Sequence, residues 1–412
     1  MSDQMHFLGE NPRAVRPRVV LNWGLGVDST VILHKYLTDP SSRDFDLKDL
    51  TVLTAQVGDE HESTRELVER FMYPLLRKAG VRVVEVARAG PKVGHGITVL
   101  QDTSAARRCH IEGDYRLSQE LMAAGSVPTF NGKKGRLCTL KAKGAVMDAW
   151  LEKEMGGRVF RSVVGFNGDE MKRVERDRSY TTTQRIAEHP LVTWGMGRAA
   201  CEAYLRDVFG VPWLKSCCVM CPFAGGKKAA IARLAAEPAG AGRALLVERV
   251  ALSLNPRMTL FKGRSLAGCF GEEHNEEVLT ALERELDTLP WALYRVRRYY
   301  RGAGDGDRDT SILERGSRFE MAVALQSMAR SAGRDLVRED GIDRLYALNR
   351  AKTYPAGEEF VVAAPAVVAE KRKPGFLARW QSFVSADLWG GVPALAGTGP
   401  QVASPALAGC GM

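Results

Sequence analysis

The chain has 412 residues, which is long enough for two or three domains. Its formal net charge at pH 7 is +9, which suits anionic partners such as nucleotides and nucleic acids. No uninterrupted apolar run is long enough to span a bilayer. Residues 1–17, which we interpret as an N-terminal arm, lack the apolar core of a signal peptide, so we expect a cytoplasmic protein that does not enter a membrane.

The first half of the chain alternates between two hydrophobic patterns. The pattern predicts strands over 18–23, 50–57, 81–87 and 158–166, and helices over 29–37 and 62–80, the second closed by Gly80. Strands that alternate with helices imply an α/β fold, an open parallel sheet with helices on both faces. We assign this fold to residues 18–226.

The pattern changes after residue 226. Residues 275–289 and 317–337 have helical periodicity, and we predict a mainly helical C-terminal region over 227–389. Residues 390–412 are rich in Ala, Gly and Pro, which is typical of a disordered tail.

A glycine-rich turn, "GLGVDST", joins the first strand to the first helix. Gly24 and Gly26 let the backbone turn tightly and approach a ligand, and the helix N-terminus can hold an anion. Ser29 and Thr30 add hydroxyl donors, whereas Asp28 is suited to capping the helix or holding a magnesium ion. A plain helix cap beside a turn is the alternative.

This turn resembles the pyrophosphate-binding loop (PP-loop) of the adenine nucleotide alpha-hydrolase-like superfamily. Within that superfamily the chain is most similar to the phosphoadenosine phosphosulfate reductase family, particularly its phage-type and bacterial members. The resemblance covers roughly residues 18–226 and extends over "AQVGDEHESTRE", "GRLCTLKAK", "GFNGDEMKRVE" and "PLVTWGMGRAACEAYL" leading into "LKSCCVMCPF".

The resemblance implies an enzyme that binds ATP or an adenylyl-sulfate nucleotide and carries out sulfur chemistry. Such an enzyme either reduces activated sulfate, with a thiol or protein reductant, or adenylates a substrate and releases pyrophosphate. The chain departs from the family pattern at Asn22, at Leu25, which replaces the middle glycine of the loop, and at Gln56, where the family usually has aspartate. Asp59 and Glu60 are close enough in sequence to substitute for that aspartate.

Residues 131–143, "NGKKGRLCTLKAK", carry five cations and no acid. Such a run is either a solvated charged segment or a loop that closes over phosphate or sulfate, since Arg offers paired hydrogen bonds and Lys a point charge. The resemblance places part of this run, and "GDEMKR" after a later strand, at the substrate site. The candidate residues are Lys133, Arg136, Cys138, Thr139, Lys141, Glu170 and Arg173.

Cysteines provide the strongest metal pattern in the chain. Cys218 and Cys221 have the Cys-x-x-Cys spacing that lets two thiolates hold one ion or cluster, and Cys138 and Cys201 lie in the family-matched motifs. The resemblance favours a four-iron four-sulfur cluster on these four cysteines, with zinc as the alternative. Cys201 is otherwise a buried apolar residue on a helix.

Residues 294–302, "YRVRRYYRG", interleave arginines with tyrosines. The stretch either binds a nucleic-acid strand through phosphate contacts and base stacking, or is one helix face with arginines in water and tyrosines packed. Two alternative functions therefore remain open. One is a nucleic-acid sulfur-modification or thiolation factor that uses ATP, and the other is a zinc-binding protein without catalysis.

Overall fold

The structure of the protein is a computed structural model that describes residues 18–131 and 135–385. The arm expected over 1–17, the tail expected over 390–412 and the candidate Lys133 lie outside these described residues.

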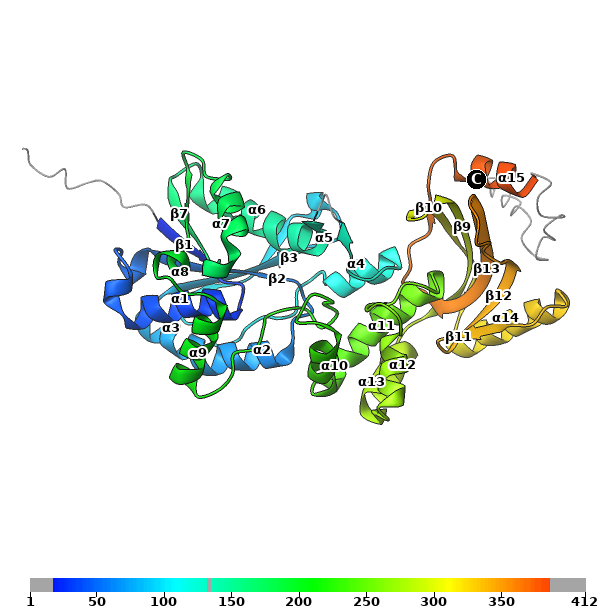
Figure 1. Cartoon of the computed structure of the whole chain (residues 1–412), viewed down its shortest axis with the longest axis horizontal. Coiled ribbons are helices and arrows are strands. Elements are labelled where there is room, and N and C mark those ends of the chain that lie inside the picture. The colour runs from blue at the N-terminus through cyan, green and yellow to red at the C-terminus, as the bar shows by residue number, and fades with distance from the viewer. Residues whose placement is uncertain (1–17, 132–134, 386–412) are drawn as a thin grey trace, which may run out of the picture. The chain divides into compact units, whose positions relative to one another are not determined.

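The chain divides into two compact units (Figure 1). The first consists of Met1–Leu117 and Thr129–Val219, and the second of Ser118–Pro128 and Met220–Met412. The second unit thus includes a short segment from within the sequence of the first.

The first unit is built on a six-stranded sheet in the order β4-β3-β2-β1-β7-β8. All neighbouring strands are parallel except β3 and β4, which are antiparallel, so the predicted parallel sheet is confirmed in its centre, and the edge strands β4 and β8 were not predicted. The strands are β1 Arg18–Asn22, β2 Leu50–Gln56, β3 Arg82–Arg88, β4 Ile97–Thr103, β7 Phe160–Val164 and β8 Arg185–Glu188.

Helices cover both faces of this sheet (Figure 1). Along β1, Val19 and Leu21 pack into one core with α1, whereas Val20 packs into a second core with Trp150 of α6. This alternation explains why the strand reads as an unbroken apolar run. The helices are α1 Val27–Thr38, α2 Glu62–Leu67, α3 Tyr73–Ala79, α5 Leu137–Thr139, α6 Ala145–Met155, α7 Met171–Arg178, α8 Pro190–Thr193 and α9 Arg198–Phe209.

The helix predicted over 62–80 is present in three parts. A π-helical turn, Val68–Met72, joins α2 to α3. Pro74 stands in the first turn of α3, directly after the π-helical turn. Gly80 closes the helix with φ 64°, a left-handed conformation that glycine adopts at little cost.

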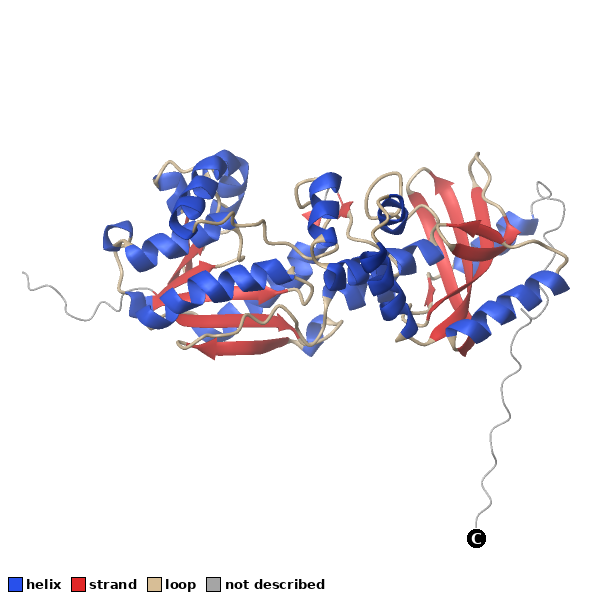
Figure 2. Ribbon diagram, turned by 90° about the horizontal axis from the view of Figure 1, so that it is seen from below, coloured by secondary structure: helices blue, strands red, loops and turns tan. Residues whose placement is uncertain are grey.

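The second unit contains a six-stranded antiparallel sheet in the order β11-β12-β13-β9-β10-β14 (Figure 2). The expectation of a mainly helical region is therefore wrong, although the helices predicted over 275–289 and 317–337 are confirmed as α13 and α14. The strands are β9 Trp291–Gly302, β10 Asp305–Gly316, β11 Val337–Glu339, β12 Ile342–Leu348, β13 Ala356–Pro365 and β14 Lys371–Arg372.

The helices of the second unit are α10 Lys227–Ala235, α11 Pro238–Leu254, α12 Leu266–Glu272, α13 Glu276–Asp287, α14 Arg318–Ser331 and α15 Phe376–Ser385. Helix α4, Leu117–Ala124, supplies the segment from within the first unit's sequence. Throughout the described ranges, we find no helix with the length and apolar character needed to cross a bilayer.

The arginine-tyrosine stretch 294–302 is a strand, not a helix, because it lies within β9. Arg297 and Arg298 do not extend into water. They form ion pairs with Asp309 at 2.6 Å and Glu358 at 3.1 Å, on the two neighbouring strands. The tyrosines of the stretch are packed in part, with Tyr294 fully buried.

Segment Ser118–Pro128 is held to the rest of the second unit by backbone acceptors. Arg308 of β10 donates to the carbonyl oxygens of Ala124 and Gly125, at 2.6 and 3.2 Å. The amide of Ala369 donates to Ala123 O at 3.0 Å. The unit is therefore discontinuous in sequence.

Candidate functional site

The glycine turn leads directly from β1 into α1. Gly26 caps α1 without a side-chain hydrogen bond, so the N–H groups of its first turn lack a capping side chain. A Cβ on Gly24 would meet nothing within 4 Å, which leaves the approach to the turn open. Thr30 is fully buried and its Oγ1 accepts a hydrogen bond from Trp23 Nε1 at 3.0 Å, so its hydroxyl is packed inside the unit.

Sheet topology places this turn where α/β sheets bind ligands. The chain runs outward from β1 to β2 and β3, and later returns to β7 on the other side of β1. Such a reversal leaves a crevice at the carboxyl ends of the two central strands. Gly165 follows β7 there, and a Cβ on it would lie 2.7 Å from Ser29 N, so only glycine allows β7 to end against the first turn of α1.

Asp28, in the first turn of α1, is surrounded by donors from two later segments. Asn167 Nδ2 donates to its Oδ1 at 3.2 Å, Arg198 Nη1 lies 3.0 Å from its Oδ2, and the Cys201 thiol also bonds to it. Burial raises the pKa of Asp28, and Arg198 and Asn167 oppose that rise. The carboxylate is thus a fixed polar centre beside the turn.

Arg198 is the first residue of α9, whose N-terminus reaches the same place. Its backbone N–H donates to Asp169 Oδ2 at 2.7 Å, and Asp169 N donates to Asn167 Oδ1 at 2.9 Å. These bonds tie the segment after β7 to the start of α9. The Arg198 side chain is 38% exposed, which leaves it able to reach a ligand as well as Asp28.

Asn167, Asp169 and Arg198 were not among the candidates from sequence. Asp169 adjoins the candidate Glu170, and Arg198 lies within one of the stretches on which the resemblance rests, so position in these stretches was the available indication. No spacing rule connects them to Asp28, because the fold brings them together across about 140 to 170 residues of chain.

The segment after β2 packs beside the turn. Glu60 accepts from Cys217 N at 2.5 Å and from Ser216 Oγ at 3.2 Å, and Trp213 Nε1 donates to Leu25 O at 3.0 Å. The candidate Asp59 is buried, and its backbone oxygen accepts from Val219 N at 2.8 Å. Glu60 therefore anchors the 213–219 segment against the glycine turn.

The four candidate metal ligands occupy different settings. Cys201 is fully buried in the hydrophobic core around α1, and burial, with Asp28 nearby, raises the pKa of its thiol to about 12. Cys138 is half-buried in α5, Cys218 pairs with Glu60 in a β-bridge, and Cys221 belongs to the second unit's sequence. Within the described residues, no three His, Cys, Asp or Glu side chains are grouped as metal ligands.

Burial favours the neutral form of the free Cys201 thiol, whereas a metal ion deprotonates the thiols that it binds. The cluster, and its zinc alternative, stay predictions.

The remaining candidates differ in exposure. Arg136, in the short strand β6 (Gly135–Arg136), and Thr139 and Lys141, in the helical run that follows, are exposed. Glu170 is half-buried, forms an ion pair with the exposed Arg173, and its charge adds to the rise in the pKa of Asp28. The structure thus brings the turn and Asp28 together with Arg198, with Glu170 nearby.

One open cavity of about 460 Å³ lies elsewhere in the first unit, beside the last turn of α1 and β8. Its lining includes Arg43, Arg161 and Trp194, and contains none of the candidate residues.

Comparison of the chain with protein families, curated proteins and solved structures finds no match.

Proposed function

We propose that the first unit binds an adenine nucleotide, ATP or an adenylyl-sulfate nucleotide, at the carboxyl ends of β1 and β7. The observation that carries the proposal is the meeting of the uncapped α1 N-terminus with Asp28 and Arg198 at the reversal of strand order. Helix N-termini and a guanidinium attract phosphate, and the glycine turn admits it. The resemblance to phosphoadenosine phosphosulfate reductases supports the choice of an adenine nucleotide.

Each group has a distinct task in this proposal. Gly24, Gly26 and Ser29 receive the phosphates through backbone N–H groups and a hydroxyl. Arg198 binds the anionic end of the nucleotide, where a planar guanidinium makes paired hydrogen bonds. Asp28 is the carboxylate that would hold a magnesium ion brought in with the phosphates, since magnesium usually takes one or two protein carboxylates and completes its shell with phosphate and water.

Two reactions are compatible with such a site, and both belong to sulfur chemistry. In the first, a thiol or protein reductant supplies two electrons to the sulfonyl sulfur of an adenylyl-sulfate nucleotide, and sulfite leaves. In the second, a substrate oxygen attacks the α-phosphate of ATP and pyrophosphate leaves. In the second reaction, the substrate can be a nucleic acid that is to be modified with sulfur. Neither reaction includes a step on a metal cluster.

Isothermal titration calorimetry with ATP and with phosphoadenosine phosphosulfate tests the proposal. We expect one nucleotide to bind, and Arg198→Ala to weaken it by about 1.5–3 kcal/mol, the usual value of a hydrogen bond to a charged group. Arg206→Ala is the matched control, because Arg206 lies in the last turn of the same helix. Failure of both nucleotides to bind the unmodified protein would reject the proposal.

Product analysis then separates the two reactions. Release of sulfite from phosphoadenosine phosphosulfate with a dithiol present indicates reduction. Release of pyrophosphate from ATP indicates adenylation.

A further inference from the structure

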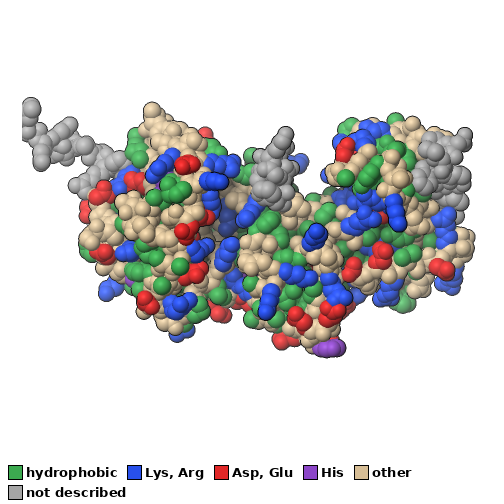
Figure 3. Space-filling view, viewed as in Figure 1, with side chains coloured by type: hydrophobic (Ala, Val, Ile, Leu, Met, Phe, Trp, Pro, Cys, Tyr) green, Lys and Arg blue, Asp and Glu red, His purple; other side chains and the backbone are tan. Residues whose placement is uncertain are grey.

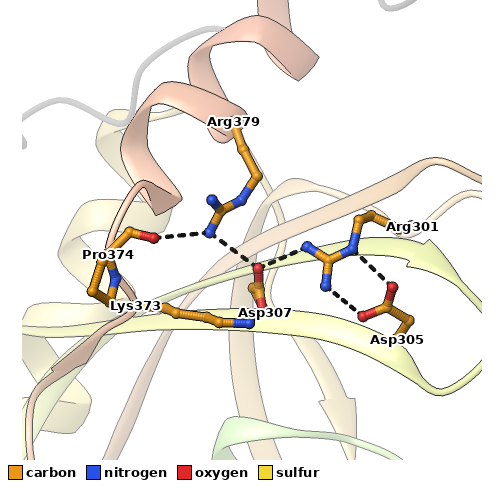
Figure 4. Close-up of polar contacts among 6 residues, drawn as sticks. All are labelled: Arg301, Asp305, Asp307, Lys373, Pro374 and Arg379. Atoms are coloured by element: carbon orange, nitrogen blue, oxygen red, sulfur yellow. Dashed lines mark hydrogen bonds and ion pairs between the residues drawn. The ribbon is translucent and has the colours of Figure 1, made fainter.

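A buried carboxylate in the second unit is surrounded by three cations. Asp307 of β10 accepts from Lys373 Nζ at 2.6 Å, Arg301 Nη1 at 3.0 Å and Arg379 Nη2 at 3.1 Å. Figure 4 shows the three side chains converging on Asp307 from β9, from the segment after β14 and from α15. One carboxylate balances only one of these charges.

A second buried carboxylate of β10, that of Asp309, is also paired with more than one cation. Asp309 accepts from Arg372 Nε at 2.7 Å and from Arg297 Nη2 at 2.6 Å. Arg372 belongs to β14, the outermost strand of the sheet, which pairs only with β10 among the described strands. We define the basic edge as Arg301, Lys371, Arg372, Lys373 and Arg379.

The carboxylates lie beneath the cations. The side chains of Asp307 and Asp309 are 3% and 1% exposed, whereas those of Lys373 and Arg372 are 55% and 51% exposed. The buried acids thus fix the positions of the cations and leave much of their surface in water. Holding the cations in place lowers the entropy that a partner must overcome on binding.

The group carries excess positive charge. With Arg297 included, six cations face four carboxylates, since Asp305, which pairs with Arg301, and Glu370, which accepts from Ile312 N, add to Asp307 and Asp309. In Figure 3, Lys and Arg side chains gather on the visible face of the second unit near β10. Ion pairs that only fastened α15 and β14 to the sheet would not require this excess.

We propose that the basic edge binds the phosphodiester backbone of a nucleic acid, independently of base sequence. Lys and Arg that neutralise phosphates release counter-ions, and this release supplies most of non-specific nucleic-acid affinity. Such contacts position a nucleic acid without reading its bases, which fits a surface with cations at its edge. The inference does not depend on nucleotide binding by the first unit.

Fluorescence anisotropy of the full-length protein tests this surface, with labelled DNA and RNA duplexes of about 20 base pairs at salt concentrations from about 50 to 200 mM. The test variant is Arg372→Ala/Lys373→Ala. The control is Arg284→Ala/Arg330→Ala, which removes the same charge from exposed positions on α13 and α14. An excess of ATP in parallel titrations keeps the first unit's site occupied.

We expect duplex binding that weakens with salt, and a slope of log affinity against log salt that falls by about two in the test variant and by less than one in the control. ATP should change neither value. Preference between the DNA and RNA duplexes identifies which backbone the edge favours. If the test variant unfolds, Lys371→Glu replaces it, because Lys371 is exposed in β14.

Absence of salt-dependent binding, or equal slopes for test and control variants, would overturn the proposal. Equal binding of polyglutamate and duplex would also overturn it, and would assign the edge to an acidic protein segment instead.

Discussion

Leu25 shows how a leucine can occupy a position whose backbone favours glycine. Its φ is 59°, in the left-handed region that glycine adopts at little cost. The cost of such a backbone for a leucine is about 1–2 kcal/mol. Its side chain is only 2% exposed and belongs to the core around α1, and burial of a leucine contributes about 1.5–3 kcal/mol. Burial therefore offsets the backbone strain.

At position 25, glycine should give a more stable protein than alanine, which is the reverse of their usual order. We expect Leu25→Gly to be about 1 kcal/mol more stable than Leu25→Ala, because glycine removes the strain and alanine keeps it. At Leu33, buried within α1, glycine should instead be less stable than alanine by about 1 kcal/mol. Urea unfolding of the four variants measures both differences. The same order at both positions would show that Leu25 is unstrained.

Cys201 and Cys218 should differ in their effect on bound metal. Because Cys201 is fully buried in the hydrophobic core around α1, we expect Cys201→Ser to keep the metal content of the unmodified protein. Cys218→Ser should lower that content if Cys218 and Cys221 hold the metal. Iron, zinc and sulfide analysis after anaerobic purification measures this. Equal loss in both variants would restore Cys201 as a ligand.

At the scale of elements, sequence pattern predicted the strands in which apolar residues predominate and failed at the strand in which charged residues alternate with apolar ones. β1, β2 and β3 are largely apolar, although β3 carries the buried Glu85. β9 alternates Arg with Val and Tyr, and Arg295, Arg297 and Arg298 are largely buried because Glu359, Asp309 and Glu358 lie opposite on neighbouring strands. Those partners are up to 64 residues away, so local pattern could not reveal them.

The residues of the candidate site also differ in whether the sequence alone could reveal them. Asp28 and the glycine turn are contiguous, and sequence alone selected them. Arg198 and Asn167 reach Asp28 only after β7 and α9 take their places beside α1, and no local rule anticipates that meeting.

The contact between β7 and α1 gives a prediction for Gly165. A Cβ there would lie 2.7 Å from Ser29 N and 2.9 Å from Ser29 Cα, so Gly165→Ala must push the first turn of α1 outward. We expect a loss of about 1–3 kcal/mol in stability, together with weaker nucleotide binding. Gly24→Ala is the stability control, because its Cβ would meet nothing within 4 Å. Unfolding experiments that show no difference in stability between the two variants would contradict the close approach.

At the scale of the whole molecule, we expect the stability of the second unit to depend on pH through Glu248. Glu248 of α11 is buried, and its two oxygens accept from Leu260 N at 2.6 Å and Leu266 N at 2.5 Å. Burial raises its pKa from 4.5 to about 7, while the two backbone N–H groups and Lys227 oppose the rise and Asp340 adds to it. The Glu248 carboxyl therefore fixes the segment between α11 and α12, and the strength of this contact depends on whether the carboxyl is protonated.

Because the folded state keeps the Glu248 proton to a higher pH than the unfolded state does, stability should fall as pH rises from about 4.5 to about 7. The difference is on the order of 3 kcal/mol. Glu248→Gln should remove this slope. Hydrogen exchange of peptides over residues 255–266, corrected for the intrinsic rate, measures it in the full chain. A slope that survives in Glu248→Gln would assign the dependence to another group.

The discontinuous second unit has a consequence for how the protein can be made in pieces. Residues 118–128 leave the ribosome roughly 200 residues before Arg308 and β14, so this segment must await its partners while the first unit completes its sheet. A gene fragment that begins at residue 220 encodes Arg308 without the carbonyl oxygens of Ala124 and Gly125 that accept from its guanidinium. We expect a fusion that joins residues 118–128 to that fragment to express as soluble protein, and the fragment alone to aggregate.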